Sequence, residues 1–284
     1  MGRHGGVGTA RALTWPTHSA VARDRSSPSA GAPWAWALSG ALAGLILSLL
    51  LFAPARWLGS AMQQSTAGQV LLLDARGTVW QGSARLMLAG GIGSSDAAEL
   101  QGRVRWTLRA ALGGLRAQIA ADCCTSDPVV LHYRPAWRGG EVRFGDNTSQ
   151  WPLALLAGLG TPWNTVQPQG AVHLSTRGLS VEWVAGRIAI GGQARMDVLG
   201  ASSRLSTLRP MGSYRITLNG GSTSTLQLDT LEGRLQLQGS GQWVGSRLRF
   251  AGEASAAPEH EAALSNLLNI IGRRSGPRSI ITLG

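Results

Sequence analysis

The chain has 284 residues, 44% of them hydrophobic, which is enough to bury the core of one large β domain or two smaller ones. Its formal net charge is +11, and all 26 basic residues are arginine, because lysine is absent from the sequence. These arginines are scattered singly along candidate strands, without an arginine-rich helix or an aromatic–basic motif, so we expect no nucleic-acid partner.

The first predicted element is a membrane-spanning helix over residues 34–53. It lies in an uncharged, apolar stretch of about 20 residues, the length that crosses a bilayer as a helix. Trp34 and Trp36 lie at one end of the stretch and Trp57 lies just beyond the other, as interfacial anchors do. We therefore predict a single spanning helix.

The charges around this helix predict its orientation. Four arginines and one aspartate precede it, whereas only Arg56 follows closely, so the positive-inside rule places the N-terminus in the cytoplasm. We expect a disordered cytoplasmic tail over 1–33, a signal-anchor helix over 34–53 and a linker over 54–68. A cleaved signal peptide is the alternative, because Ala53-Pro54-Ala55 resembles a cleavage site, but the apolar run exceeds the usual signal core.

From residue 69 onward the apolar residues recur with a period of two, which predicts strands with one buried face. In residues 102–109, Val104, Trp106 and Leu108 share one face, and arginine and threonine occupy the other. Gly, Asn, Asp and Ser turns separate such segments, which favours an all-β fold, an antiparallel meander that forms a curved sheet or a sandwich over 69–284. The same alternation places seven later side chains inward: Tyr214, Ile216, Leu218, Leu235, Leu237, Leu248 and Phe250.

One later segment, residues 258–272, is predicted to be a helix. Pro258 suits the first turn, and Gly272 suits the position just after the last turn. We expect this helix to pack over one end of the sheet, with partner binding as the alternative. A second short helix is expected within 149–160. The apolar stripe of the C-terminal helix consists of Ala263, Leu264, Leu267, Leu268 and Ile271.

A faint internal repeat links two parts of the β region. Residues 101–109 and 169–177 both begin with Gln-Gly and continue with alternating apolar positions. The resemblance favours two similar halves, about 69–145 and 169–284.

The two cysteines, Cys123 and Cys124, are adjacent. Their options are a disulfide between neighbours, an intermolecular bridge or two buried thiols, and a disulfide between neighbours departs from ordinary disulfide geometry. Metal binding is not expected, because no second cysteine pair or histidine cluster accompanies them.

No catalytic motif stands out in the β region. It contains three histidines, of which His173 is expected to face water on a strand and His260 to lie at the exposed start of the C-terminal helix. Nucleophile-elbow, zinc-protease, phosphate-loop and C-x-x-C motifs are all absent from the sequence. We expect no enzyme activity, no catalytic residues, no cofactor, no metal and no small-molecule substrate.

The segment GLGTPWNTVQPQG, residues 158–170, is unusual because it combines glycines and prolines with one tryptophan. Glycine permits positive φ and proline fixes φ, so we interpret the segment as a shaped crossover that is held in place by a buried Trp163.

This segment, following a short apolar helix, resembles the signature crossover of the type II secretion system protein N family. Residues 76–86, 197–221, 231–243 and 261–284 resemble further parts of that family, in the same order. The structural signature that these stretches share with the family consists of Gly77, Trp80, Gly82, Gly160, Pro162, Trp163, Asn164, Pro168, Leu267 and Leu268.

The resemblance implies a non-catalytic inner-membrane component with a periplasmic β domain, serving a machine that exports folded proteins. It implies other type II secretion components as partners, namely the inner-membrane platform and the secretin. We expect assembly or scaffolding through sheet edges and loops. Gly-punctuated strands on one anchor also resemble AsmA-type lipid-handling proteins; a contiguous apolar lining would favour that alternative, and a closed core would count against it.

Overall fold

The computed structural model describes residues 34–245 and 247–284 of the chain. The chain divides into two compact units, Met1–Ile46 and Leu47–Gly284, and the second contains the whole β region. The tail expected over residues 1–33 lies outside the described residues.

The apolar helix expected over 34–53 is present as α1, Trp34–Leu51. Among the described residues, it is the one helix that is long and apolar enough to cross a membrane. Its side chains are exposed along its length, as an apolar surface that faces lipid would be.

The range 54–68, which we expected to be a linker, is mostly a helix, α2, Ala55–Ser65. Its small residues Ala55 and Gly59 are spaced by four and face the sheet. A Cβ added to Gly59 would lie 3.3 Å from the carbonyl oxygen of Leu72, so α2 packs closely on the first strand. This spacing of small residues was the signal for a packed helix.

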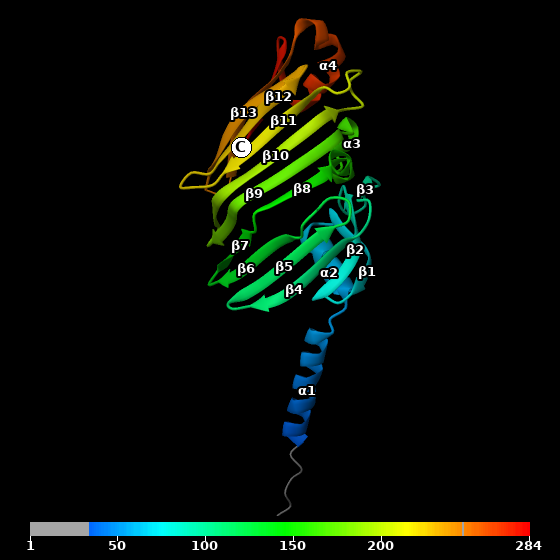
Figure 1. Ribbon diagram of the computed structural model, residues 1–284, viewed down its shortest axis with the longest axis vertical. Coiled ribbons are helices and arrows are strands. Elements are labelled where there is room, and N and C mark those ends of the chain that lie inside the picture. Colours follow the sequence, from blue (N-terminus) through cyan, green and yellow to red (C-terminus); the bar gives the residue numbers. More distant parts are fainter. Residues whose placement is uncertain (1–33, 246) are drawn as a thin grey trace, which may run out of the picture. The chain divides into compact units, whose positions relative to one another are not determined.

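The β region forms one open antiparallel sheet (Figure 1). Consecutive strands are neighbours along most of the path β1-β2-β4-β5-β6-β7-β9-β10-β11-β12-β13-β14-β16-β15; β3 pairs with β2, and β8 pairs with β9. The all-β prediction is confirmed, in the form of an open sheet and not of a sandwich. The strands are β1 Val70–Gly77, β2 Gln81–Ala89, β3 Ala97–Glu99, β4 Val104–Ala111, β5 Gly114–Ala121, β6 Val129–Ala136, β7 Gly139–Phe144, β8 Asn147–Pro152, β9 Gln169–Val184, β10 Arg187–Ser202, β11 Gly212–Asn219, β12 Thr225–Gly233, β13 Leu235–Val244, β14 Arg247–Ala256, β15 Arg273–Ser275 and β16 Arg278–Leu283.

The alternation in the sequence gives this sheet one apolar face. Val104 and Trp106 are buried on it, while Arg105 between them is exposed. Tyr214, Leu235 and Phe250, which were predicted to point inward, are buried as well. Side chains of a strand point alternately to the two faces, so the sequence period translates directly into burial.

Three separate apolar clusters lie on this face. Near β1 the cluster centres on Ala55, Ala84 and Trp106. A second cluster, around Leu100 and Val104, lies under β2, β4 and β5. The largest belongs to the C-terminal strands and contains Leu153, Ala201, Met211, Tyr214, Leu235, Ala254, Leu264, Leu267 and Leu268.

The predicted C-terminal helix is confirmed as α4, Pro258–Ile271. Leu264, Leu267 and Leu268 of its apolar stripe are buried against the sheet. Gly272 does not end the helix with a left-handed residue, because its φ of −170° is extended backbone. Glycine is instead required there by space, since an added Cβ would lie 2.5 Å from the carbonyl oxygen of Ile280.

The two ends of the strands differ. At one end lie the tight hairpins β4–β5, β6–β7 and β9–β10, and at the other lie the crossover before β9 and helix α4 (Figure 1). The crossover and α4 cover the apolar face at their own end, and α2 covers it near β1 and β4.

Candidate functional site

The crossover between β8 and β9 is the most distinctive segment of the sheet. It contains a 3-10 helix, η1, Leu153–Leu159, and one short helical turn, α3, Trp163–Val166. The short helix expected within 149–160 is therefore present, although its first residues belong to β8. Leu155 packs against the cluster of β4 and β5, whereas Leu153 and Leu156 belong to the C-terminal cluster. The crossover thus joins the cores of the two parts of the sheet.

Close backbone contact explains the glycines of this segment. A Cβ added to Gly158 would overlap the carbonyl oxygen of Leu88 and would lie 2.6 Å from the amide nitrogen of Ala98. Gly160 has a φ of +79°, a conformation that costs residues with a Cβ more than it costs glycine. The crossover can therefore lie directly on β2 and β3.

Hydrogen bonds hold the crossover at both ends. The Asn164 side chain donates through Nδ2 to Oδ2 of Asp96, at 2.8 Å, in the loop before β3. Ser203, in the loop after β10, donates its hydroxyl to the carbonyl oxygen of Val166 at 2.6 Å. Asp96 was not among the predicted site residues, because its partner Asn164 is 68 positions away in the sequence.

The expectation that Trp163 is buried is wrong. Its side chain is 40% exposed, so it is not a buried anchor. Pro162 is also exposed, whereas Pro168 is buried at the start of β9. The contacts that hold the crossover are the hydrogen bonds of Asn164 and Ser203 and the close approach of Gly158 to β2 and β3.

The other predicted signature residues lie in two further places. Gly77 and Gly82 flank the turn between β1 and β2, where Gly82 leaves room for the ring of Trp106. Trp80 in this turn donates its indole N–H to the carbonyl oxygen of Leu50 at 2.7 Å. Leu267 and Leu268 are buried residues of α4 and belong to the C-terminal core cluster. The signature therefore marks three packing points and not one site.

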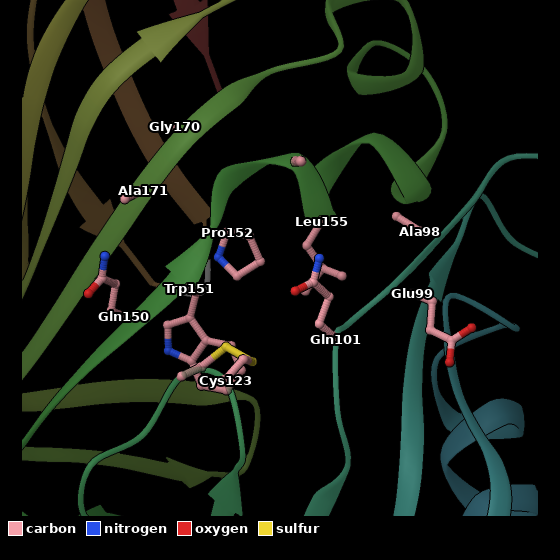
Figure 2. A pocket seen from close by; sticks show the side chains of 12 residues that line it. Ala98, Glu99, Gln101, Cys123, Gln150, Trp151, Pro152, Leu155, Gly170 and Ala171 are labelled. Carbon is pink, nitrogen blue, oxygen red and sulfur yellow. A yellow bond between two sulfur atoms is a disulfide. The ribbon is translucent and has the colours of Figure 1, made fainter.

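A cavity of about 500 Å³ lies beside the crossover (Figure 2). Trp151, Leu155 and Cys123 give it an apolar part, and Gln150 and Glu99 give it a polar part. Glu99 pairs with Arg85, at 3.0 Å between Oε1 and Nη1. The cavity is large enough to accommodate a side chain or a small group.

Cys123 and Cys124 form a disulfide between neighbouring residues, which decides among the three options left by the sequence. The pair lies in the loop after β5, where the amide N–H of Gln150 donates to the carbonyl oxygen of Cys124 at 2.8 Å. A further bridge joins Thr125 to Ser149. The loop after β5 is thereby hydrogen-bonded to β8.

The charged side chains form ion pairs on the outward face. Asp197 accepts two hydrogen bonds of 2.7 Å from Arg215, and this guanidinium holds the pKa of the carboxyl below its usual range. Arg103 does the same for Asp74, with help from Arg76. On the buried face, desolvation raises the pKa of the Tyr214 hydroxyl, which donates to the Leu235 carbonyl oxygen at 3.1 Å.

Of the three histidines, His173 lies directly opposite Asp197, across β9 and β10. His173 is exposed on β9, as predicted, but His260 is half-buried. Among residues 34–245 and 247–284, no three His, Cys, Asp or Glu side chains are close enough to hold a metal ion.

At the hairpin end, the apolar face continues beyond the three core clusters. Leu115, Tyr133, Val142, Val181 and Ile190 lie directly opposite one another on adjacent strands from β5 to β10. Most of them are only half-buried, and none belongs to a core cluster.

A second apolar row crosses the C-terminal strands. It consists of Ala194, Leu218, Leu226, Gly241, Phe250 and Leu283.

Comparison with protein families gives one match. The model of the family described as type II secretion system (T2SS), protein N, matches residues 68–281, which is nearly all of the β region. Comparison with curated proteins and with solved structures gave no significant match.

Proposed function

The chain belongs to the type II secretion system protein N family, and on this premise we propose that it is a non-catalytic, single-pass inner-membrane accessory component of that machine. The proposal places the N-terminus in the cytoplasm and the sheet in the periplasm. The observation that carries it is the family match over residues 68–281. Helix α1 supports the membrane anchor, because its length and apolarity suit a bilayer.

We propose that the sheet acts by assembly, through contacts with the inner-membrane platform and the secretin. An open sheet has two edges, whose unpaired N–H and C=O groups can accept a partner strand. Helix α2 packs on β1 at Leu72, and β15 covers β16 only at residues 278–280. The last residues of β16, Ile281 to Leu283, are therefore the better candidate edge.

A deletion strain tests this function. Its loss should leave exoproteins folded in the periplasm while the outer-membrane barrier stays intact. A periplasm-dependent reporter fused after Gly284 should be active, and release of the β region into the soluble periplasm would contradict the anchor. At the edge, Thr282→Pro should reduce secretion more than Thr282→Ala, because main-chain hydrogen bonds would carry the contact.

A second candidate function is lipid handling, as in AsmA-type proteins. The two apolar rows favour it, because they leave part of the sheet face lined by apolar side chains and not covered by a closed core. This function predicts the opposite phenotype, a leaky outer membrane with normal exoprotein release and lipid that copurifies with the protein. Both phenotypes are measured in the same deletion strain.

A further inference from the structure

Three hairpins at the same side of the sheet end in exposed apolar residues. Leu112, between β4 and β5, is fully exposed, and Trp137, between β6 and β7, is 93% exposed. Val184, at the turn between β9 and β10, is exposed as well. We call these three turns and their flanking residues the hairpin rim (Figure 1). Single exposed apolar side chains are common on protein surfaces. Exposed apolar side chains on several neighbouring turns are not, and they indicate a contact surface.

Arginines flank each of these tips. The first tip reads Arg109-AALGGL-Arg116, an uncharged apolar stretch between two cations. Arg138 follows Trp137, and Arg187 follows the third turn. All four arginines are exposed, and within the part of the chain that the structure describes none of them forms a salt bridge.

On the outward face of the sheet, two arginines lie directly opposite each other, and a third arginine follows along the same row. The register pairs Arg109 with Arg116, and His132 lies between Arg116 and Arg143 in the same row. Only Arg143 has a carboxylate partner, Glu141, among the described residues. Like charges directly opposite each other on neighbouring strands destabilise a sheet, so an anionic partner at this row would remove that cost.

The opposite face at the same level is apolar. Leu115 neighbours Arg116 in β5, and it begins the row that continues through Tyr133, Val142 and Val181. The rim therefore has apolar tips, one apolar face and one face on which the arginines outnumber the carboxylates Glu141 and Glu182. This is the distribution of an element that lies in a membrane interface, with apolar groups in the acyl region and cations among the headgroups.

We propose that the hairpin rim docks on the surface of a bilayer that contains anionic phospholipid. Tryptophan and leucine at the tips suit the boundary between headgroups and acyl chains, and the arginines suit the phosphates. The tips protrude singly from two-strand hairpins, which suits insertion between lipids. The proposal goes beyond the secretion role, because it concerns a second membrane contact in addition to α1.

The test uses the full chain in nanodiscs of phosphatidylcholine, with or without phosphatidylglycerol. Leu112→Cys carries an environment-sensitive dye, and Cys123 and Cys124 are paired, so the new thiol is labelled selectively. We expect blue-shifted emission, and quenching by lipid-borne spin labels, in the discs with phosphatidylglycerol. High salt should reverse both effects, since it screens the arginines.

Charge variants sharpen the test. Each arginine near an anionic surface strengthens association by about fivefold, so Arg109→Ser with Arg116→Ser should weaken docking by about 25-fold. The matched control, Arg234→Ser with Arg273→Ser, removes the same charge from exposed positions elsewhere and should leave docking unchanged.

Three outcomes would overturn the proposal: a dye that stays solvent-exposed in both kinds of disc, equal effects of the two arginine pairs, or a blue shift that requires an added acidic protein. A dye at Trp137→Cys gives an independent reading, and unchanged unfolding curves exclude a folding defect.

Discussion

The same alternation of apolar residues leads to a buried core at one end of the strands and to exposed apolar side chains at the other. At the end with the crossover and α4, Leu264 and Leu268 are completely buried in the largest core cluster. At the hairpin end, Leu115 continues the same face but stays exposed, and Leu112 protrudes beyond it. The difference is whether a helix covers the strand end. Alternation determines which face is apolar, and the connections determine which part of that face becomes core.

The largest difference in unfolding free energy is expected between two leucine-to-alanine variants, one at each end of the strands. Leu268→Ala should lower the free energy of unfolding by about 2–5 kcal/mol, because it empties a site with 0% exposure. Leu112→Ala should change it by less than about 0.5 kcal/mol, since the side chain packs against little. Chemical denaturation of both variants measures the difference, and equal losses would mean that the hairpin end is packed as tightly as the other.

The crossover offers a second contrast, between a glycine and a tryptophan. Gly158→Ala should cost about 1–3 kcal/mol, because the new methyl group overlaps the backbone of β2 and β3. Trp163→Ala should cost no more than about 1 kcal/mol, because this side chain is 40% exposed. Thermal unfolding compares the two variants. A larger loss for the tryptophan would restore its expected anchoring role.

The sequence did not indicate that Gly158→Ala should destabilise the protein more than Trp163→Ala. Composition and periodicity predicted the all-β fold, the inward side chains and α4, since each depends on local pattern. Burial of Trp163 depends on which strands lie beneath the crossover, and that follows from sheet topology. Helix α2 was missed because its buried residues, Ala55 and Gly59, are small and give a weak apolar pattern.

A smaller effect is expected from the hydrogen bond between Asn164 and Asp96. Asn164→Ala should lower the free energy of unfolding by about 1 kcal/mol, since the bond is partly buried and has a carboxylate acceptor. A double-mutant cycle with Asp96→Ala isolates this pair. Additive losses would show that the two side chains do not act together.

The smallest effect concerns acid stability. Arg215 lowers the pKa of Asp197 in the folded protein, so the unfolded chain binds this proton more readily. The contribution is fully present above about pH 4, the usual range of an aspartate, and is lost as the pH falls through the lowered folded pKa. It should amount to less than about 1 kcal/mol at this partly exposed pair.

Unfolding curves of Asp197→Asn and of the parent protein, taken from neutral to acid pH, measure this contribution. The two should converge in acid, and a constant difference would contradict the assignment.

The candidate site was predictable only in part. The sequence indicated the positive φ of Gly160, whereas Gly158 is required by close backbone contact with β2 and β3 and not by a positive φ. It did not reveal Asp96, which contacts the crossover from a distant loop, or the row that joins Arg109, Arg116, His132 and Arg143, which depends on strand register. For Cys123 and Cys124 it left three options open, of which the disulfide is present.

The most direct test of the account is exoprotein release per folded molecule in a deletion strain. The strain is complemented with the parent chain, Trp163→Ala or Gly158→Ala, and the ratio of extracellular to periplasmic exoprotein is divided by the amount of folded protein. If the protein serves secretion and the crossover is architectural, the deletion retains folded exoprotein, and each variant restores release in proportion to its folded amount. Normal release without the protein, or a fully folded Trp163→Ala variant that restores none, would contradict the account.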